Sequence, residues 1–390
     1  METRKDTISQ RVQAIPASGI RKYFDLLNSM EGVISLGVGE PDFVTPWHIS
    51  EAGIYAVEKG YTMYTSNYGI IELREEIARH LRARYGLEYD PKNEILVTSG
   101  SSEALDLAMR AILDPGQEVI IPDPSYVAYM PYTILAGGTA VPVPTYVEND
   151  FKVRASDIDE KVTERTKAVL LGYPNNPTGT VLEKSDLEEI AGVVKNHDLM
   201  VISDDIYDRL VYDGEHTCLA ALPGMRERTI LVNGFSKAYA MTGWRIGYTA
   251  APAHIIEAMM KVHQYVMMCA PIMGQMAALE ALQNGEESVR KMVTEYDRRR
   301  RVIVEGLNDI GLACFEPKGA FYAFPSIEST GLSSDDFVEG LLTEEKVAVV
   351  PGSAFGECGE GYIRCCYAVA LPDIEEALER MRRFAVKYRS

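Results

Sequence analysis

The chain has 390 residues, and at about 100 to 200 residues per domain this length predicts two or three structural units. Hydrophobic residues make up 46% of it and charged residues 25%, as in an ordinary globular protein, which excludes a disordered or fibrous chain. Lysines and arginines number 39 against 57 acidic residues, so the formal net charge is −18. Because this excess opposes binding to a phosphate backbone or an anionic lipid surface, we expect no nucleic acid partner and no membrane partner.

The cysteines and the apolar stretches bear on the compartment of the protein. Six cysteines are too few for a disulfide scaffold in so long a chain, and none forms a C-x-x-C pair, so we expect free thiols and no metal site. Residues 1–10 are polar and lack the apolar run of a secretory signal. The most apolar stretch, at 265–282, is interrupted by Pro271, Gly274 and Glu280, which argues against a membrane span. These features predict a cytoplasmic protein.

Short apolar runs with the length of β-strands recur between residues 95 and 232. Longer segments separate most of them, and in these segments apolar residues return every three or four positions, as they do in helices. Alternating strands and helices predict an α/β unit with a buried, mostly parallel sheet. Ser185 and Glu188 have the spacing of a capping box, which predicts the start of one helix. The predicted strands are 95–97, 119–121, 168–171, 200–202 and 230–232, and the predicted helices include 103–113, 187–195 and 255–266.

The pattern changes after about residue 285. One long charged helix is followed by predicted strands at 321–324, 347–350 and 362–367 and by a final helix from about Asp373, which together predict a smaller α+β domain. The first 45 or so residues carry no series of buried strands, so we expect them to join the small domain or a partner subunit. The predicted divisions are an N-terminal segment at 1–46, a large domain at 47–285 and a small C-terminal domain at 286–390.

The long charged helix contains four consecutive arginines at 298–301. A basic run of this kind can mark a nucleic-acid site. Here it follows Glu295 and Asp297 at helical spacing in an acidic chain, so the prediction is a solvated helix face.

Lys237 is the residue with the most specific surroundings. It follows the predicted strand at 230–232 and lies among small and apolar residues, a setting that lowers the pKa of an ammonium group and leaves a nucleophilic amine. Most lysines are solvated, so the alternative for Lys237 alone is an ordinary surface residue. Ser236 beside it and Arg245 eight residues later add a hydroxyl donor and a permanent cation, which together suit a bound phosphate.

Three further strand ends carry polar residues. The turn after 95–97 brings Ser101 and Ser102 to the start of a helix, where they either cap it or, with its free N–H groups, bind an anion. Asn176 lies in a turn made rigid by two prolines, so it is either part of a plain turn or an amide presented to a ligand. Asp204 ends the strand at 200–202, and a buried carboxylate there needs a cation such as a protonated heterocyclic nitrogen.

Together these motifs resemble the class I/II aminotransferases of fold type I, which depend on pyridoxal 5'-phosphate. The resemblance extends from Gly-Val-Gly-Glu-Pro-Asp-Phe at 37–43 to Arg364, nearly the whole chain. Its most specific parts are Asn-Asn-Pro-Thr-Gly at 175–179 and the segment at 236–245 that begins Ser-Lys and ends Gly-Trp-Arg. The resemblance implies a mostly parallel seven-stranded sheet flanked by helices in a large cofactor-binding domain, with the smaller α+β domain beside it. Aspartate and aromatic aminotransferases are the most similar members.

The resemblance also implies roles for single residues. Lys237 would form the internal aldimine, and Asp204 would pair with the nitrogen of the pyridine ring. Tyr207 and Asn176 would hydrogen-bond the phenolic oxygen of the ring. A carboxylate on the ring nitrogen keeps that nitrogen protonated, which makes the cofactor an electron sink for the carbanion formed at the substrate Cα.

The remaining implied contacts concern the phosphate and the substrate. Tyr64 resembles the tyrosine that reaches the phosphate of the neighbouring subunit, which implies a homodimer. Arg364 lies where the family binds the substrate α-carboxylate, Gly39 lies in the loop that lines the substrate side, and Asn176 contributes there too. The implied contacts of the phosphate and of the ring face are Ser101, Ser102, Ser236 and Arg245 for the phosphate and Tyr126, stacked on the ring.

The predicted function is therefore transamination. The enzyme would move the amino group of an L-amino acid, aspartate or an aromatic one, to a 2-oxo acid such as 2-oxoglutarate. Two alternatives stay open at this point: another pyridoxal-phosphate reaction on the same scaffold, such as β-elimination, and a non-catalytic ligand-sensing domain. The second would need an attached basic DNA-binding module. The amino donor is undecided, because no arginine can be placed unambiguously for a second substrate carboxylate from the sequence. Arg21 and Lys22, in the N-terminal segment, are the candidates for that contact.

Overall fold

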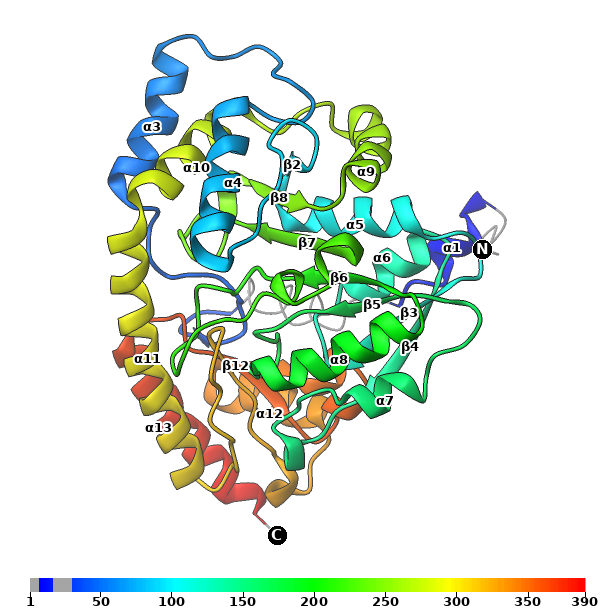
Figure 1. Ribbon diagram of the computed structural model, residues 1–390. Helices are drawn as coiled ribbons and strands as arrows, with labels where there is room; N and C mark the ends of the chain where they lie inside the picture. Colours follow the sequence, from blue (N-terminus) through cyan, green and yellow to red (C-terminus); the bar gives the residue numbers. More distant parts are fainter. Residues whose placement is uncertain (1–6, 17–29, 390) are drawn as a thin grey trace.

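The computed structural model describes residues 7–16 and 30–389 (Figure 1). Its centre is a seven-stranded sheet with the strand order β2-β8-β7-β6-β5-β3-β4. Strand β8 runs antiparallel to both of its neighbours, and the other paired strands are parallel, which confirms the predicted mostly parallel sheet. The strands are β2 (Ile95–Thr98), β3 (Glu118–Asp123), β4 (Thr139–Pro144), β5 (Thr166–Leu171), β6 (Met200–Asp204), β7 (Thr229–Gly234) and β8 (Gly247–Ala250).

Helices cover both faces of this sheet. The principal ones are α5 (Gly100–Ile112), α8 (Lys184–Asn196) and α9 (Ala253–Val266). Successive residues of a strand point to opposite faces, so both kinds of position must be apolar in a buried strand. In β5, Leu170 packs in one core cluster with residues of α5 and α9, while Val169 and Leu171 pack in another with residues of α8. In Figure 1, α5 and α9 accordingly lie on the opposite side of the sheet from α8.

Two strands and one helix start differ from the predictions. Strand β4 lies at the sheet edge, is partly exposed and contains two prolines, so it lacks a continuous apolar run. Strand β8 is short and begins with a glycine, so it also lacks a continuous apolar run. The predicted capping box of Ser185 and Glu188 is wrong: α8 is capped by Glu183, whose backbone N–H donates to Asp186 Oδ2 at 2.8 Å.

The C-terminal part of the chain builds smaller sheets. The parallel pair joins β1 (Ile34–Ser35) and β10 (Val347–Ala348), and the three-stranded sheet has the order β11-β12-β9. The predicted strands at 321–324 and 362–367 are confirmed, although they are shorter: β9 is Tyr322–Ala323 and β12 is Ile363–Cys366. The predicted strand at 347–350 is instead divided between two sheets, as β10 and β11 (Val350–Pro351). The division of the chain at residues 46 and 285 stays a prediction.

The other helices complete the molecule. Within the described parts of the chain, none is both long and apolar enough to cross a membrane. Figure 1 shows α11 and α13 side by side along one flank, with α12 near them. These helices are α1 (Gln10–Gln13), α3 (Trp47–Glu58), α4 (Ile71–Tyr85), α6 (Tyr129–Leu135), α7 (Ala155–Asp159), α10 (Ile272–Asn284), α11 (Glu286–Asp309), α12 (Ser334–Glu345) and α13 (Leu371–Tyr388).

The arginine run on α11 is not a uniformly solvated face, so that prediction is wrong for two of its members. Arg299 and Arg300 are buried, with 6% and 1% of their surface exposed, whereas Arg298 and Arg301 are exposed. Arg299 pairs with Asp42 at 2.8 Å and lies over the ring of Phe43. A buried guanidinium needs carboxylate partners. Each of these two arginines has one partner on α11 and at least one from a distant segment, which local spacing does not show.

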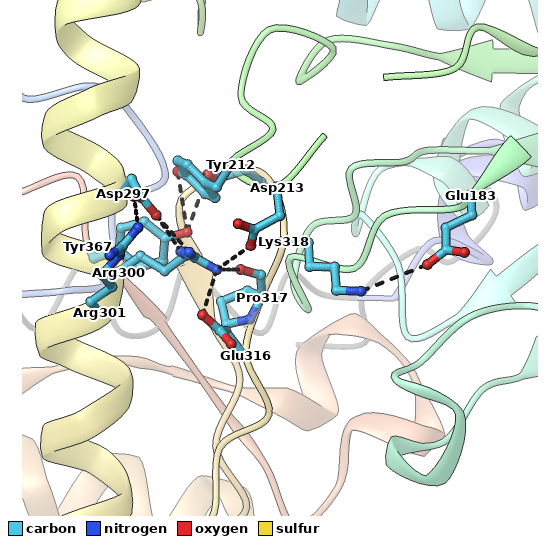
Figure 2. A network of polar contacts seen from close by, with 11 residues as sticks. Glu183, Tyr212, Asp213, Asp297, Arg300, Arg301, Glu316, Pro317, Lys318 and Tyr367 are labelled. Carbon is cyan, nitrogen blue, oxygen red and sulfur yellow. Dashed lines mark hydrogen bonds and ion pairs between the residues drawn. The ribbon is translucent and has the colours of Figure 1, made fainter. Parts of the chain in front are cut away.

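Arg300 ties α11 to two loops (Figure 2). Its guanidinium lies 2.7 Å from Asp297, 3.0 Å from Glu316 and 3.3 Å from Asp213. It also donates to the carbonyl oxygen of Pro317 at 2.9 Å. Arg300 therefore joins the loop after β6 to the loop before β9.

Replacing Arg300 with methionine should destabilise the protein, because three carboxylates would lose their shared cation. We expect the free energy of unfolding to fall by about 3 kcal/mol, since breaking a buried ion pair costs about 3 to 5 kcal/mol and these carboxylates keep some contact with solvent. Arg301→Met should change it by less than about 0.5 kcal/mol, because the Arg301 side chain is exposed. Urea unfolding measures both, and equal midpoints for the two variants would contradict the assignment.

Candidate active site

A cavity of about 370 Å³ lies at the carboxyl ends of the parallel strands. The segments that follow β2, β3, β5, β6 and β7 all contribute to its lining, and so does the segment that enters the antiparallel β8. Every site residue predicted from the sequence lines this cavity except Tyr64. The predicted residues that meet there are Gly39, Ser101, Ser102, Tyr126, Asn176, Asp204, Tyr207, Ser236, Lys237, Arg245 and Arg364.

Asp204 is a buried carboxylate at the end of β6, with 4% of its surface exposed. Its Oδ2 accepts a hydrogen bond from Tyr129 at 2.9 Å, and its Oδ1 accepts one from the backbone N–H of Ile206 at 3.3 Å. Burial raises the pKa of Asp204 to about 6, because it disfavours the ionised form. A cation placed against this carboxylate would therefore be held strongly.

Lys237 follows β7 and extends into the same cavity. Its Nζ donates to the carbonyl oxygen of Gly39 at 2.5 Å and lies 5.8 Å from the centre of the Tyr207 ring. Burial lowers the pKa of the Lys237 ammonium group to about 8. The amine is thus closer to its neutral, nucleophilic form than a solvated lysine would be.

The start of α5 forms the anion-binding end of the cavity. Helix α5 has no side-chain cap, so the N–H groups of its first turn are free to bind an anion. Gly100 has a φ of +78°, and a Cβ there would lie 2.4 Å from an Nη atom of Arg245. Glycine at this position therefore lets the Arg245 guanidinium approach the helix start. Ser101, Ser102 and Ser236 line the same region.

Arg364, on β12, lies at the other side of the cavity. Its two Nη atoms donate to Asn176 Oδ1 at 2.9 Å and to the carbonyl oxygen of Gly37 at 2.6 Å. The guanidinium lies over the rings of Tyr322 and Phe355, at 4.5 and 4.9 Å from their centres. Its Nε is buried and has no hydrogen-bond partner within the described chain, so it is a donor that a bound anion can satisfy.

Two tyrosines of the lining were missed by sequence reasoning. Tyr129 bonds Asp204, and it comes three residues after Tyr126, a spacing that places both on one side of a helical turn. The hydroxyl of Tyr322 lies 2.7 Å from that of Tyr207 and 3.5 Å from the carbonyl oxygen of Gly39. Tyr322 follows Phe321 in an ordinary strand-like run, so no local signal marks it.

Tyr64 lies elsewhere. It is 81% exposed and borders a different, apolar hollow beside α10. Within one chain it does not reach the cavity that holds Lys237.

Comparison with known proteins agrees with this geometry. The family model of aminotransferase class I and II matches residues 31–381. The chain belongs to this family. It is 59% identical to a putative aminotransferase of Bacillus subtilis (97% of this chain, 98% of the other) and 50% identical to an aspartate aminotransferase of Pyrococcus abyssi (96% and 97%). A solved aromatic aminotransferase from Pyrococcus horikoshii superposes with a TM-score of 0.90 at 50% identity, covering 94% of this chain and 99% of that one.

Aminotransferases of this family use pyridoxal phosphate, and the cavity fits that cofactor. It combines a buried carboxylate that has no ion pair among the described residues, a desolvated lysine, and an uncapped helix start beside an arginine. These suit, in turn, a protonated ring nitrogen, an aldehyde and a phosphate. The protein is therefore a pyridoxal-phosphate-dependent transaminase.

Replacing Arg364 with lysine should weaken substrate binding in this aminotransferase. One ammonium group cannot reproduce the fork of donors that Asn176 and Gly37 orient, so we expect KM to rise by about 10- to 100-fold while the visible spectrum of the bound cofactor is unchanged. Steady-state kinetics with varied amino donor measures this. Arg298→Lys, an exposed change, is the control, and an unchanged KM in Arg364→Lys would remove Arg364 from the substrate site.

Proposed function

We propose that this aminotransferase moves the amino group of an L-amino acid, either aspartate or an aromatic one, to 2-oxoglutarate. Its relatives support both donors: the Pyrococcus abyssi protein is named for aspartate and the Pyrococcus horikoshii structure for aromatic substrates, each at 50% identity. The observation that carries the proposal is the single cavity in which Lys237, Asp204 and Arg364 meet.

The cavity has residues that can bind the substrate carboxylate and the ring of the cofactor. Bound pyridoxal phosphate supplies an electron sink for the carbanion left when a proton leaves the substrate Cα. Arg364 binds the substrate α-carboxylate, with its guanidinium held by Asn176 and Gly37. Asp204 balances the charge of the ring nitrogen at the buried end, and Tyr207 and Asn176 hydrogen-bond the phenolic oxygen.

Lys237 is the proposed attachment point and general base. Its lowered pKa, to about 8, raises the neutral fraction of the amine near pH 7, and only the neutral amine has the lone pair that removes a proton from Cα. The carbonyl oxygen of Gly39, 2.5 Å from Nζ, keeps the amine inside the cavity. Lys237 would therefore hold the cofactor and would also move the proton at the substrate Cα.

The phosphate is assigned to the uncapped end of α5. Arg245 supplies the permanent charge, and the backbone N–H groups supply directed donors. Tyr126, in the lining of the cavity, would stack on the face of the ring. The hydroxyl groups that complete this phosphate site are those of Ser101, Ser102 and Ser236.

The working unit is proposed to be a cytoplasmic homodimer. Tyr64 and Met63 are each 81% exposed beside an apolar hollow, a surface that a second copy of the chain would cover, and Tyr64 would then serve the phosphate of that copy. The six cysteines are free thiols, as is usual in a reducing compartment. The divisions at residues 46 and 285 are part of this proposal, with the cofactor in the large domain.

The charges of the lining bear on the choice of donor. Among the described residues of the cavity the cations are Lys237, Arg245 and Arg364, and each already has a proposed partner. Glu40, also in the lining, adds a negative charge and accepts a hydrogen bond from Thr242 at 3.0 Å. The described lining therefore favours an uncharged aromatic side chain, whereas aspartate would need a cation from the neighbouring subunit or from Arg21 or Lys22, which lie outside the described residues.

The deciding experiment is a panel of amino donors with 2-oxoglutarate as acceptor. We would measure glutamate formation and kcat/KM for aspartate, alanine, phenylalanine, tyrosine and kynurenine. We expect glutamate as product, with an aromatic donor at least as good as aspartate. Release of ammonia and a 2-oxo acid without glutamate would instead indicate an elimination reaction and refute the proposed transfer.

A further inference from the structure

Tyr129 is a buried residue that the proposed mechanism does not use. It starts α6, has 4% of its surface exposed, and its hydroxyl lies 2.9 Å from Asp204 Oδ2. The edge of its ring meets Tyr126, with the ring centres 5.4 Å apart and an interplanar angle of 83°. Tyr129 is thus placed between the predicted ring-stacking residue and the carboxylate that receives the ring nitrogen.

The position of the Tyr129 hydroxyl depends on a glycine of the neighbouring strand end. A Cβ added at Gly172, directly after β5, would lie 2.1 Å from this hydroxyl oxygen. Any other residue at position 172 would therefore push the hydroxyl away from Asp204. The glycine is needed for this close approach, since its φ is not in the left-handed region.

The hydroxyl matters because Asp204 has few other partners. The remaining hydrogen bond to its carboxylate, from the backbone of Ile206, is longer at 3.3 Å. None of the ion pairs among the described residues includes Asp204. Its negative charge is therefore stabilised by its two hydrogen-bond donors and by the bound cofactor. The titratable groups that face it are Tyr126, Tyr129 and Tyr132 from the α6 side, Asp205 from its own strand end and Lys237 from the end of β7.

We propose that Tyr129 is a positioning residue. It keeps the Asp204 carboxylate ionised and oriented toward the ring nitrogen of the cofactor, so that this nitrogen stays protonated. Its hydroxyl donates its one proton to Oδ2, which leaves the other lone pairs of the carboxylate for the ring N–H. This inference rests on the proposed role of Asp204. It adds that electron withdrawal by the ring depends on a residue that does not touch substrate.

The direction of the pKa shift agrees with this geometry. Burial raises the pKa of Asp204 to about 6, and among the effects that oppose burial the hydrogen bond from Tyr129 is the largest. Without the hydroxyl, the pKa of Asp204 should rise further. Because Asp204 is buried, the proton would then move from the ring nitrogen to the carboxylate, leaving a neutral pair.

The test uses the full chain loaded with pyridoxal phosphate labelled with ¹⁵N in the ring. We expect the ¹⁵N chemical shift of the wild type to report a protonated nitrogen, and that of Tyr129→Phe to move toward the unprotonated value. The kcat should fall by about 10-fold or more, as for loss of a hydrogen bond to a charged group, while KM for the amino donor stays within about twofold.

Two further variants separate this role from a merely structural one. Gly172→Ala keeps the tyrosine but displaces its hydroxyl, so it should move the ¹⁵N shift in the same direction, and it should add little in the Tyr129→Phe background. Tyr85→Phe is the matched control, because it removes a hydroxyl that donates to Asp208 at 2.7 Å outside the cavity lining. It should behave as the wild type.

The outcomes are distinct. An unprotonated ring nitrogen in the wild type would refute the role of Asp204 itself. A protonated nitrogen in both wild type and Tyr129→Phe, whatever the kcat, would refute the role of Tyr129 and leave the proposed transamination standing. A shift that moves in Tyr85→Phe as much as in Tyr129→Phe would also overturn the inference.

Discussion

Replacing Lys237 with alanine is expected to reduce transamination by about 10⁴-fold or more. Loss of a general base alone removes about 10²- to 10⁴-fold in rate, and here the same substitution also removes the group that holds the cofactor. The structure supports both functions in one side chain, because the amine is buried, has its pKa lowered to about 8 and lies in the cavity with Asp204 and Arg364. Single-turnover absorbance of the cofactor band, with amino donor in excess, measures the loss.

Three comparisons make this result specific. Lys237→Arg keeps a cation in the cavity but has a side chain that stays protonated, so it should be as inactive as Lys237→Ala. A small primary amine added to the buffer should restore part of the activity to Lys237→Ala and none to Lys237→Arg. Lys291→Ala, an exposed change on α11, should leave the rate unchanged. Near-normal turnover in Lys237→Ala would refute the proposed base.

The strands of the sheet could be predicted where they form continuous apolar runs. Strands β5 and β6 have apolar residues at successive positions, because each face packs against a helix layer, and such runs stand out in the sequence. Edge strand β4 has only one well-covered face and mixes prolines with exposed positions, so it carries no such signal. Strand β8 is buried as β5 and β6 are, but its sequence Gly-Tyr-Thr-Ala contains no such run. The length of the apolar run, and not burial alone, therefore decided which strands could be predicted.

Site residues could be predicted where an ionisable side chain follows a buried strand. Lys237 and Asp204 were found because a lysine or a carboxylate at the end of a buried strand needs an explanation. The burial of Arg299 could not be predicted, because one of its two carboxylate partners, Asp42, lies 257 residues away. Tyr129 was missed for the same reason, since only the folded sheet brings it to Asp204. Contacts between distant segments are decided by topology, which local spacing does not contain.

Replacing Asp204 with asparagine should reduce kcat by about 10²- to 10³-fold, the range measured when one preorganised electrostatic partner of a developing charge is removed. The amide has nearly the same shape as the carboxylate, so packing against Ile206 and Tyr129 should be kept. It carries no charge, however, and cannot keep a ring nitrogen protonated in so buried a place. The loss should therefore fall on kcat, with KM for the amino donor little changed because Arg364 is intact.

Asp208→Asn is the matched control for this substitution. Asp208 is another buried carboxylate, accepts a hydrogen bond from Tyr85, and does not line the cavity, so its amide should leave kcat unchanged. If Asp204 acts through the ring, Asp204→Asn should also abolish the effect of Tyr129→Phe on kcat, because the tyrosine then has no carboxylate to hold. Full additivity of the two substitutions would show that Tyr129 acts by a separate route, and an unchanged kcat in Asp204→Asn with cofactor bound would remove the carboxylate from the mechanism.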